Sequence, residues 1–306
     1  MVRLVLAEPR GFCAGVRRAI PLVEESLERF GAPVYVRHEI VHNKHVIADL
    51  KQKGVVFIDE LEEADFSRPV IFSAHGVSDS VVKEAERLGL KFIDATCPLV
   101  GKVHYQIRKM AAAGKKIIII GKASHPEIIG TRGQIPADYE ACIISSAEEV
   151  DSLPFSSTDD VGFVTQTTLS VNDTKEIISR LKARFPSLEG PKQNDICYAT
   201  TNRQQAVGRL ALQCPTVIII GSKNSSNSRQ LREVALKSGA KRAFLIDDAA
   251  ELDWDALDTE NPIGISAGAS APEYLVENLL VEFKRRYGII NIGRLVITEE
   301  NVNFRL

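Results

Sequence analysis

Three segments of the chain share one layout, in which a cysteine stands between a strand-like segment and a helical one. The cysteines are Cys13, Cys97 and Cys197. A first polar loop follows each cysteine after 28 or 29 residues, and a second follows after 62, 70 and 73 residues. Such near-constant spacing is typical of a structural repeat, even where the repeated sequences hardly match. We therefore predict three copies of one α/β unit.

The six loops are rich in histidine, hydroxyl and amide side chains. The first loops contain His42-Asn43-Lys44, His125-Pro126-Glu127 and Ser225-Ser226-Asn227, and the second loops contain Ser73-Ala74-His75-Gly76, Thr165-Gln166-Thr167-Thr168 and Ala267-Gly268-Ala269-Ser270. Strands that alternate with helices predict parallel sheets, which bind ligands beyond the carboxyl ends of their strands. The cysteines and loops all fall there, so we expect them to face a common centre.

The predicted fold class is α/β, with three units related by pseudo-threefold symmetry. The predicted boundaries are residues 14–96 for unit one, 97–196 for unit two, 197–286 for unit three and 287–306 for an extended C-terminal tail. Units one and two end in a strand before the next cysteine, weakly so at residues 193–196. Unit three lacks this strand, and the N-terminal strand within residues 1–13 is predicted to complete it, closing a ring.

Five cysteines occur in the chain, and an odd number suits a disulfide framework poorly. With no signal peptide we expect a cytoplasmic protein, whose cysteines serve as metal ligands or core residues. Cys142 and Cys214 are predicted to be structural. Three cysteines from three units suit an iron–sulfur cluster in which one iron keeps an open site, because clusters usually take four. Zinc and plain burial are the alternatives, and the lack of a Cys-x-x-Cys pair disfavours zinc.

Histidines, hydroxyls and the N–H groups of helix N-termini together suit a phosphate-like anion. His42, His75 and His125 occupy matching loops, whereas the other three histidines are predicted to be surface or hydrogen-bonded core residues: His38, His45 and His104. Glu127 is either a first-turn acid or a proton donor, which needs burial or a nearby diphosphate to raise its pKa. A net charge of −2 argues against a nucleic-acid binder, and no apolar run reaches the length of a membrane span.

Seven motifs together resemble the 4-hydroxy-3-methylbut-2-enyl diphosphate reductase family, which performs the last step of the methylerythritol phosphate isoprenoid pathway. The motifs are residues 10–16 (RGFCAGV), 74–78 (AHGVS), 94–98 (DATCP), 125–127 (HPE), 166–170 (QTTLS), 196–203 (ICYATTNR) and 221–228 (GSKNSSNS). The resemblance runs from about Leu4 through the helix after Ser270. One departure is Lys122, where the family has histidine.

The resemblance implies a trefoil of three α/β units around a central [4Fe–4S] cluster bound by Cys13, Cys97 and Cys197. It implies a diphosphate-binding set of His42, His75, His125, Ser225, Ser226, Asn227 and Ser270. Thr167 is expected near the substrate hydroxyl, and Glu127 is expected to supply protons. The implied reaction is reductive dehydroxylation of 4-hydroxy-3-methylbut-2-enyl diphosphate to isopentenyl and dimethylallyl diphosphate, with electrons from ferredoxin or flavodoxin because no flavin or nicotinamide motif occurs.

Two other functions remain possible on the sequence. The first is a non-redox dehydratase or synthase with a three-cysteine [4Fe–4S] cluster, of the quinolinate synthase type. The second is a zinc or cluster protein that only senses redox state. A dehydratase needs no reductant for turnover, and a sensor has no turnover and binds no diphosphate.

Overall fold

The computed structural model describes residues 1–191 and 195–305, and its contacts divide the chain into two compact bodies. Body 1 contains residues 1–17, 41–49 and 198–303, and body 2 contains residues 18–40, 50–197 and those from Phe304 onward. The named strands form three sheets in which every pairing is parallel. The predicted α/β class with parallel sheets is therefore confirmed.

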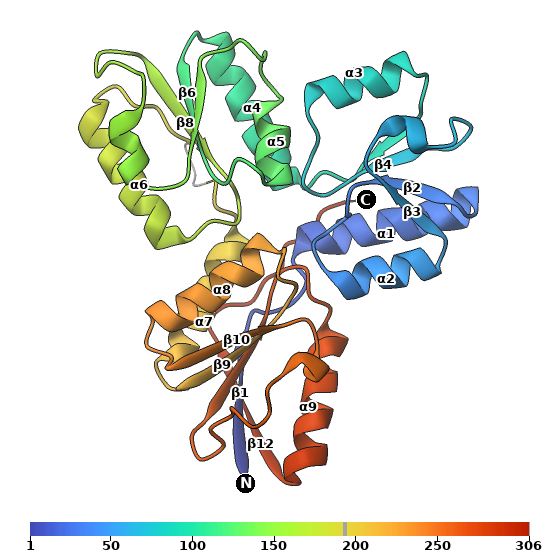
Figure 1. Ribbon diagram of the computed structural model, residues 1–306, viewed down its shortest axis with the longest axis vertical. Helices are drawn as coiled ribbons and strands as arrows, with labels where there is room; N and C mark the ends of the chain where they lie inside the picture. The colour runs from blue at the N-terminus through green and yellow to red at the C-terminus, as the bar shows by residue number, and fades with distance from the viewer. Residues whose placement is uncertain (192–194, 306) are drawn as a thin grey trace. The chain divides into compact units, whose positions relative to one another are not determined.

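Body 1 is built on a five-stranded sheet of order β10-β9-β11-β1-β12. Its strands are β1 (Val2–Glu8), β9 (Thr216–Ile220), β10 (Arg242–Ile246), β11 (Ile263–Ala267) and β12 (Ile290–Val296). Its helices are α7 (Tyr198–Ala211), α8 (Ser226–Lys237), the 3-10 helix η3 (Ala249–Glu251) and α9 (Glu273–Tyr287). In Figure 1, α9 lies along one side of this sheet and α7 and α8 lie on the other.

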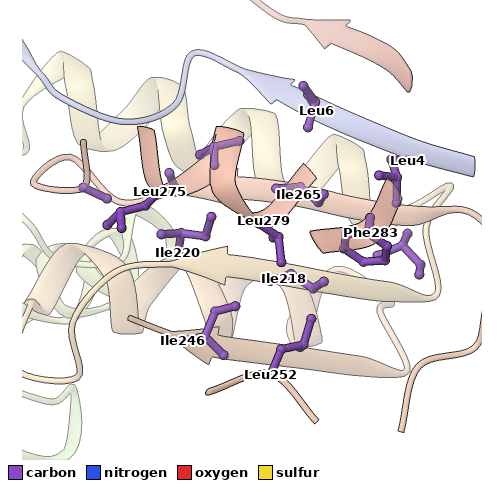
Figure 2. Packing of buried hydrophobic residues seen from close by; sticks show 14 of the residues in the cluster. Leu4, Leu6, Ile218, Ile220, Ile246, Leu252, Ile265, Leu275, Leu279 and Phe283 are labelled. Atoms are coloured by element: carbon purple, nitrogen blue, oxygen red, sulfur yellow. The ribbon is translucent and has the colours of Figure 1, made fainter. Parts of the chain in front are cut away.

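Alternate strand residues supply the two hydrophobic layers of body 1, as the period of two in a strand requires. Leu4, Ile218 and Ile265 point to one face and pack with Leu279 and Phe283 of α9 (Figure 2). Alternating neighbours on the other face pack against α7 and α8: Ala7, Val217 and Ile219. Because both faces are covered, the central strands read as continuous apolar runs.

The N-terminal strand β1 lies between β11 and β12 in this sheet. The pairing with β12 runs from Val2 opposite Ile290 to Glu8 opposite Val296, and the N–H of Ile297 donates to Glu8 O at 3.0 Å. The sequence predicted an extended tail after unit three but no strand in it. β12 escaped prediction because its side chains are mostly exposed, so they carry no buried pattern.

Body 2 contains a four-stranded sheet of order β3-β2-β4-β5 and a three-stranded sheet of order β7-β6-β8. The strands are β2 (Val34–Arg37), β3 (Val55–Ile58), β4 (Val70–Phe72), β5 (Phe92–Asp94), β6 (Lys116–Ile120), β7 (Ala141–Ile144) and β8 (Val161–Thr165). Its helices are η1 (Leu61–Glu63), α3 (Asp79–Arg87), α4 (Pro98–Ala112), α5 (Pro126–Arg132), η2 (Glu148–Ser152) and α6 (Val171–Arg184). Two further helices have residues in both bodies: α1 (Ala14–Phe30) and α2 (Lys44–Gln52).

The three-stranded sheet is covered on both faces, like the sheet of body 1. Ile117 and Ile119 pack with α4 and α5, and Ile118 and Ile120 pack with α6. The weak strand expected at residues 193–196 begins outside the described residues, and Asp195 and Ile196 form a bend. Within the described part of the chain, no helix has the length and apolar character needed to cross a membrane.

Candidate functional site

Each of the three predicted ligand cysteines makes the same backbone contact. The N–H of Cys13 donates to Ala269 O at 3.1 Å, that of Cys97 to Ala74 O at 3.0 Å, and that of Cys197 to Thr167 O at 3.1 Å. Every acceptor lies in a second polar loop. The spacing repeat in the sequence therefore corresponds to a repeated contact in the structure.

Each of these cysteines directly precedes a helix. Cys13 precedes α1, Cys97 is the N-cap of α4 with Pro98 at its first position, and Cys197 precedes α7. All three are partly exposed, so their sulfur atoms are accessible to a metal. These features suit soft-ligand chemistry at all three positions.

Cys142 and Cys214 differ from these three. Cys142 lies in β7 and Cys214 is fully buried near the end of α7, and burial raises the pKa of Cys142 and raises that of Cys214 to about 11. Cys142 is only partly buried, less than the sequence suggested. No cysteine is in a disulfide, and within residues 1–191 and 195–305 no three His, Cys, Asp or Glu side chains gather around a single-ion position.

Body 2 brings Glu127 and Thr167 into direct contact. Glu127 is 3% exposed at the start of α5, and Thr167 is 5% exposed in the loop after β8. The Thr167 N–H donates to Glu127 Oε1 at 2.6 Å, and its hydroxyl donates to Oε2 at 3.0 Å. The loop thus holds both oxygens of one carboxyl group.

Burial raises the pKa of Glu127 to about 7, although both hydrogen bonds from Thr167 act to lower it. Nearby Asp195 adds to the rise. Burial likewise raises the pKa of Asp195 to about 6, against the lowering effects of the Thr165 N–H and Lys102. Since its pKa lies near neutrality, Glu127 can both hold and release a proton there.

His75 and His125 lie edge to face in body 2, with ring centroids 5.9 Å apart. His125 is the N-cap of α5, and its Nδ1 accepts the N–H of Glu127 at 3.2 Å. In the neutral ring the proton is therefore on Nε2, which can donate a hydrogen bond. Nδ1 of His75 lies 3.4 Å from the hydroxyl of Ser73. The two rings form a pair of polar groups next to Glu127.

Body 1 gathers the remaining predicted anion-binding residues around the start of α8. Ser225 is the N-cap, with its hydroxyl accepting the N–H of Ser228, and Ser226 is the first helical residue. Asn227 Oδ1 accepts the N–H of Ala269 at 2.9 Å. Its Nδ2 is buried and has no partner among the described residues. That nitrogen can therefore donate to a bound anion.

His42 and Ser270 also meet in body 1. The hydroxyl of Ser270 donates to the backbone oxygen of His42 at 2.9 Å, which joins the first loop of one repeat to the second loop of another. Ser270 is 7% exposed. The Asn227 side chain accepts the N–H of Ala269, the residue before Ser270. Asn227 therefore lies in the same local cluster as His42 and Ser270.

Sequence reasoning missed two buried amides in the loops. Asn43 is fully buried, and its side-chain oxygen caps α2 by accepting hydrogen bonds from the N–H groups of His45 and Val46. Its Nδ2 has no hydrogen-bond partner among the described residues. Asn43 therefore holds the N-cap position that His125 and Ser225 hold in the other two units. The spacing of the sequence had assigned that position to His42. The preference of asparagine for N-caps could have shown this.

The second missed residue is Gln166, which is fully buried. Its Oε1 accepts the N–H of Lys122 at 3.2 Å, and its Nε2 donates to Thr168 at 2.9 Å. It thereby ties the first and second loops of one unit together beside Thr167. Position 122, where the sequence departs from the family, contributes only its backbone N–H to this bond.

Three histidines were predicted to have no role in the site. The ring of His38 lies within hydrogen-bond distance of Asp59 (3.2 Å), and that of His45 lies within hydrogen-bond distance of Asp248 (3.0 Å). His104 is a buried core residue as predicted, but its Nε2 has no hydrogen-bond partner in the described part of the chain. Burial lowers its pKa to about 4, and Arg108 adds to the effect.

The fold and these residues define an α/β protein with cysteines at three equivalent strand-to-helix junctions and a buried acid–hydroxyl pair. A family model described as LytB protein matches residues 4–284, so the chain belongs to the LytB protein family.

Relatives in this family carry the name that the motifs suggested. The chain is 52% identical to 4-hydroxy-3-methylbut-2-enyl diphosphate reductase of Gluconobacter oxydans (strain 621H), over 100% of this chain and 91% of the relative. It is also 52% identical to the enzyme of that name from Actinobacillus pleuropneumoniae serotype 5b, over 100% and 97%. The resemblance stated from the sequence is confirmed.

A solved structure agrees. The E-1-hydroxy-2-methyl-but-2-enyl-4-diphosphate reductase of Plasmodium falciparum superposes with a TM-score of 0.95 and 36% identity, covering 100% of this chain and 95% of that one. The relatives and the Plasmodium falciparum protein are all named as reductases, so the chain is a member of a family of oxidoreductases.

Proposed function

We propose that this protein reduces 4-hydroxy-3-methylbut-2-enyl diphosphate to isopentenyl and dimethylallyl diphosphate, using two electrons delivered through one [4Fe–4S] cluster. The observation that carries this proposal is the Glu127–Thr167 pair, because loss of a hydroxyl group as water needs a proton donor. The names of the relatives, which specify this diphosphate, support the choice of substrate.

The donor set of the chain fits such a cluster. Cys13, Cys97 and Cys197 are partly exposed thiols at helix N-termini, each with its backbone fixed by a second-loop carbonyl. In a cluster each cysteine binds a different iron, and three cysteines leave one iron without a protein ligand. When bound, the cluster would pass on electrons from the external donor and would provide Lewis-acid chemistry for the substrate oxygen.

Each body by itself contains polar groups of the predicted diphosphate-binding set. In body 1 they are His42, Ser225, Ser226, Asn227 and Ser270, and the buried Nδ2 of Asn227 needs an acceptor. In body 2 they are His75 and His125, the latter with a proton on Nε2 when neutral. The hydroxyl and amide side chains are neutral hydrogen-bond donors, and the histidines are donors that can also take up a proton. Both kinds of donor suit phosphate oxygens.

Proton transfer is the task of Glu127 and Thr167. Near neutral pH the carboxyl of Glu127 holds a proton, which it passes to the hydroxyl of Thr167, and Thr167 gives its own proton to the departing substrate oxygen. The overall reaction consumes two electrons and two protons, breaks one C–O bond, forms one C–H bond and releases water. The second proton reaches either end of the allylic unit, which accounts for two products.

The electrons come from a protein donor such as ferredoxin or flavodoxin, and the enzyme acts in the cytoplasm. The test is an anaerobic reaction of the reduced, cluster-loaded protein with 4-hydroxy-3-methylbut-2-enyl diphosphate, followed by product analysis. Isopentenyl and dimethylallyl diphosphate are expected only with a reductant. Turnover without reductant would point to a dehydratase of the quinolinate synthase type, and a colourless protein containing zinc would exclude the cluster.

A further inference from the structure

A buried arginine connects the C-terminal tail to the loop that carries Cys13. Arg203, in α7, is 1% exposed and is among the largest fully buried side chains described. Its Nη1 donates to both carboxylate oxygens of Glu300, at 2.9 and 3.1 Å, and to Ala199 O at 3.0 Å. The Glu300 side chain is 5% exposed and also accepts a bond from Asn202 at 3.0 Å. All these residues belong to body 1.

The rest of the guanidinium group binds a single backbone oxygen. Nε and Nη2 of Arg203 donate to the carbonyl of Gly11, at 3.1 and 2.8 Å. Gly11 lies two residues before Cys13 and has a φ of +65°, a conformation that L side chains rarely adopt. On its other side the loop is held by Gly11 N–H to Ala267 O and Cys13 N–H to Ala269 O, each at 3.1 Å. Arg203 therefore completes the fixation of the segment from Gly11 to Cys13.

The tail reaches Arg203 along a defined path. β12 pairs with the whole length of β1, the strand that leads toward Cys13. Four residues after β12 ends at Val296, Glu300 meets Arg203 beside a cavity of about 360 Å³ whose lining includes Phe12, Arg17 and Glu299. The carboxylate neutralises the buried guanidinium and orients its planar fork, since Arg203 would otherwise hold an uncompensated charge.

We propose that Glu300 and Arg203 are positioning residues for the Cys13 ligand, which makes the C-terminal segment from Ile290 to Asn303 part of the support of the cluster site. Glu300 orients Arg203, Arg203 fixes the carbonyl of Gly11, and the fixed loop presents Cys13 in one conformation. This inference rests on the proposed function, because it takes Cys13 as a cluster ligand. Supports of metal ligands of this kind affect how tightly the ligand holds its metal.

The test measures cluster release from the full chain. Wild type, Glu300→Gln, Arg203→Lys and the control Glu299→Gln are loaded anaerobically with iron and sulfide, and loss of cluster absorbance to an iron chelator is followed. Glu299 is exposed and lines the same cavity, so its variant matches the charge change of Glu300→Gln. We expect release about 10–100-fold faster for the Glu300 and Arg203 variants and unchanged for the control.

A double variant separates positioning from simple charge burial. Arg203→Met with Glu300→Met removes both charges, so no buried charge is left unpaired. If positioning is the role, release stays fast in the double variant because the Gly11 carbonyl has lost its donors. Recovery of wild-type release in the double variant would overturn the inference, and so would wild-type release in both single variants.

Amide hydrogen exchange of the cluster-free full chain gives a second readout that needs no iron. Peptides covering residues 9–17 are expected to exchange faster in Glu300→Gln than in wild type, because the Cys13 N–H bond to Ala269 O opens more often. Equal exchange would contradict the inference. If wild type binds no cluster, the proposed function fails and this inference with it. If wild type holds the cluster but the variants hold it equally, only the inference fails.

Discussion

Both donors of Thr167 point at one carboxyl group: its N–H meets Oε1 of Glu127 at 2.6 Å and its hydroxyl meets Oε2 at 3.0 Å. The backbone bond fixes the carboxyl in place and favours its charged form, whereas burial favours the neutral form and raises the pKa to about 7. The hydroxyl bond can run in either direction, since a protonated carboxyl can donate to the threonine oxygen. The pair therefore exchanges a proton without rearranging.

Replacement of Glu127 by glutamine removes this proton while keeping the size of the side chain. We expect turnover to fall by about 10²–10⁴-fold with iron content unchanged. Product formation under anaerobic, reducing conditions measures the first quantity, and iron analysis measures the second. Glu140→Gln, at an exposed position before β7, serves as the control. A Glu127→Gln variant with full activity would rule out the proton-donor role.

The pKa of Glu127 also makes a prediction about stability. Because its pKa is raised from 4.5 to about 7 in the folded chain, the folded state holds this proton more tightly than the unfolded state. The stabilising contribution is complete below about pH 4.5 and is lost as the pH rises to about 7. The free energy of unfolding of cluster-free wild type and of Glu127→Gln is measured in urea at pH 5 and pH 8. From pH 5 to pH 8 we expect wild type to lose up to about 3 kcal/mol more of this free energy than the variant. Equal dependence in both proteins would refute the raised pKa.

Thr167→Val removes the hydroxyl and keeps the backbone N–H bond to Oε1. The carboxyl then stays in place but has no hydroxyl through which to pass its proton. We expect kcat to fall by about 10–100-fold, with Thr167→Ser retaining most of the activity. Similar kcat values for the valine and serine variants would show that the hydroxyl takes no part.

Asn227→Asp keeps the oxygen that accepts the Ala269 N–H but replaces the unpartnered Nδ2 with a negatively charged oxygen. An anionic substrate should bind more weakly, so we expect KM to rise by about 10-fold or more. Steady-state kinetics measure this, and Asn261→Asp in an exposed loop controls for added charge. An unchanged KM would remove Asn227 from the diphosphate site.

Serine substitutions sort the five cysteines. Cys13→Ser, Cys97→Ser and Cys197→Ser should each lower the iron retained after anaerobic reconstitution, because a hydroxyl is a poor ligand for iron in a cluster. Cys142→Ser and Cys214→Ser should retain iron, with Cys214→Ser costing stability because that side chain is fully buried. Loss of iron in either control variant would undo the division of the cysteines.

Much of the architecture followed from local patterns. The apolar runs at Ile117–Ile120 and Val217–Ile220 became β6 and β9, since a strand buried on both faces needs such residues throughout. The similar distances from Cys13, Cys97 and Cys197 to the polar loops that follow them correspond to the same backbone contact at each cysteine, because the same unit is built three times. β12 was not foreseen, because its side chains are mostly exposed and show no buried pattern, and its place in the sheet comes from pairing with β1.

The sequence by itself determined the α/β class, the repeat, the family and the candidate residues, because periodicity and spacing are properties of the chain. Only the tertiary structure decided the burial, the pKa values and the long-range contacts of those residues. The raised pKa of Glu127 depends on burial beside Asp195, and the link from Glu300 through Arg203 to Gly11 joins residues 97 and 192 positions apart. Desolvation and long-range contacts arise only when distant segments pack together, so no local pattern records them.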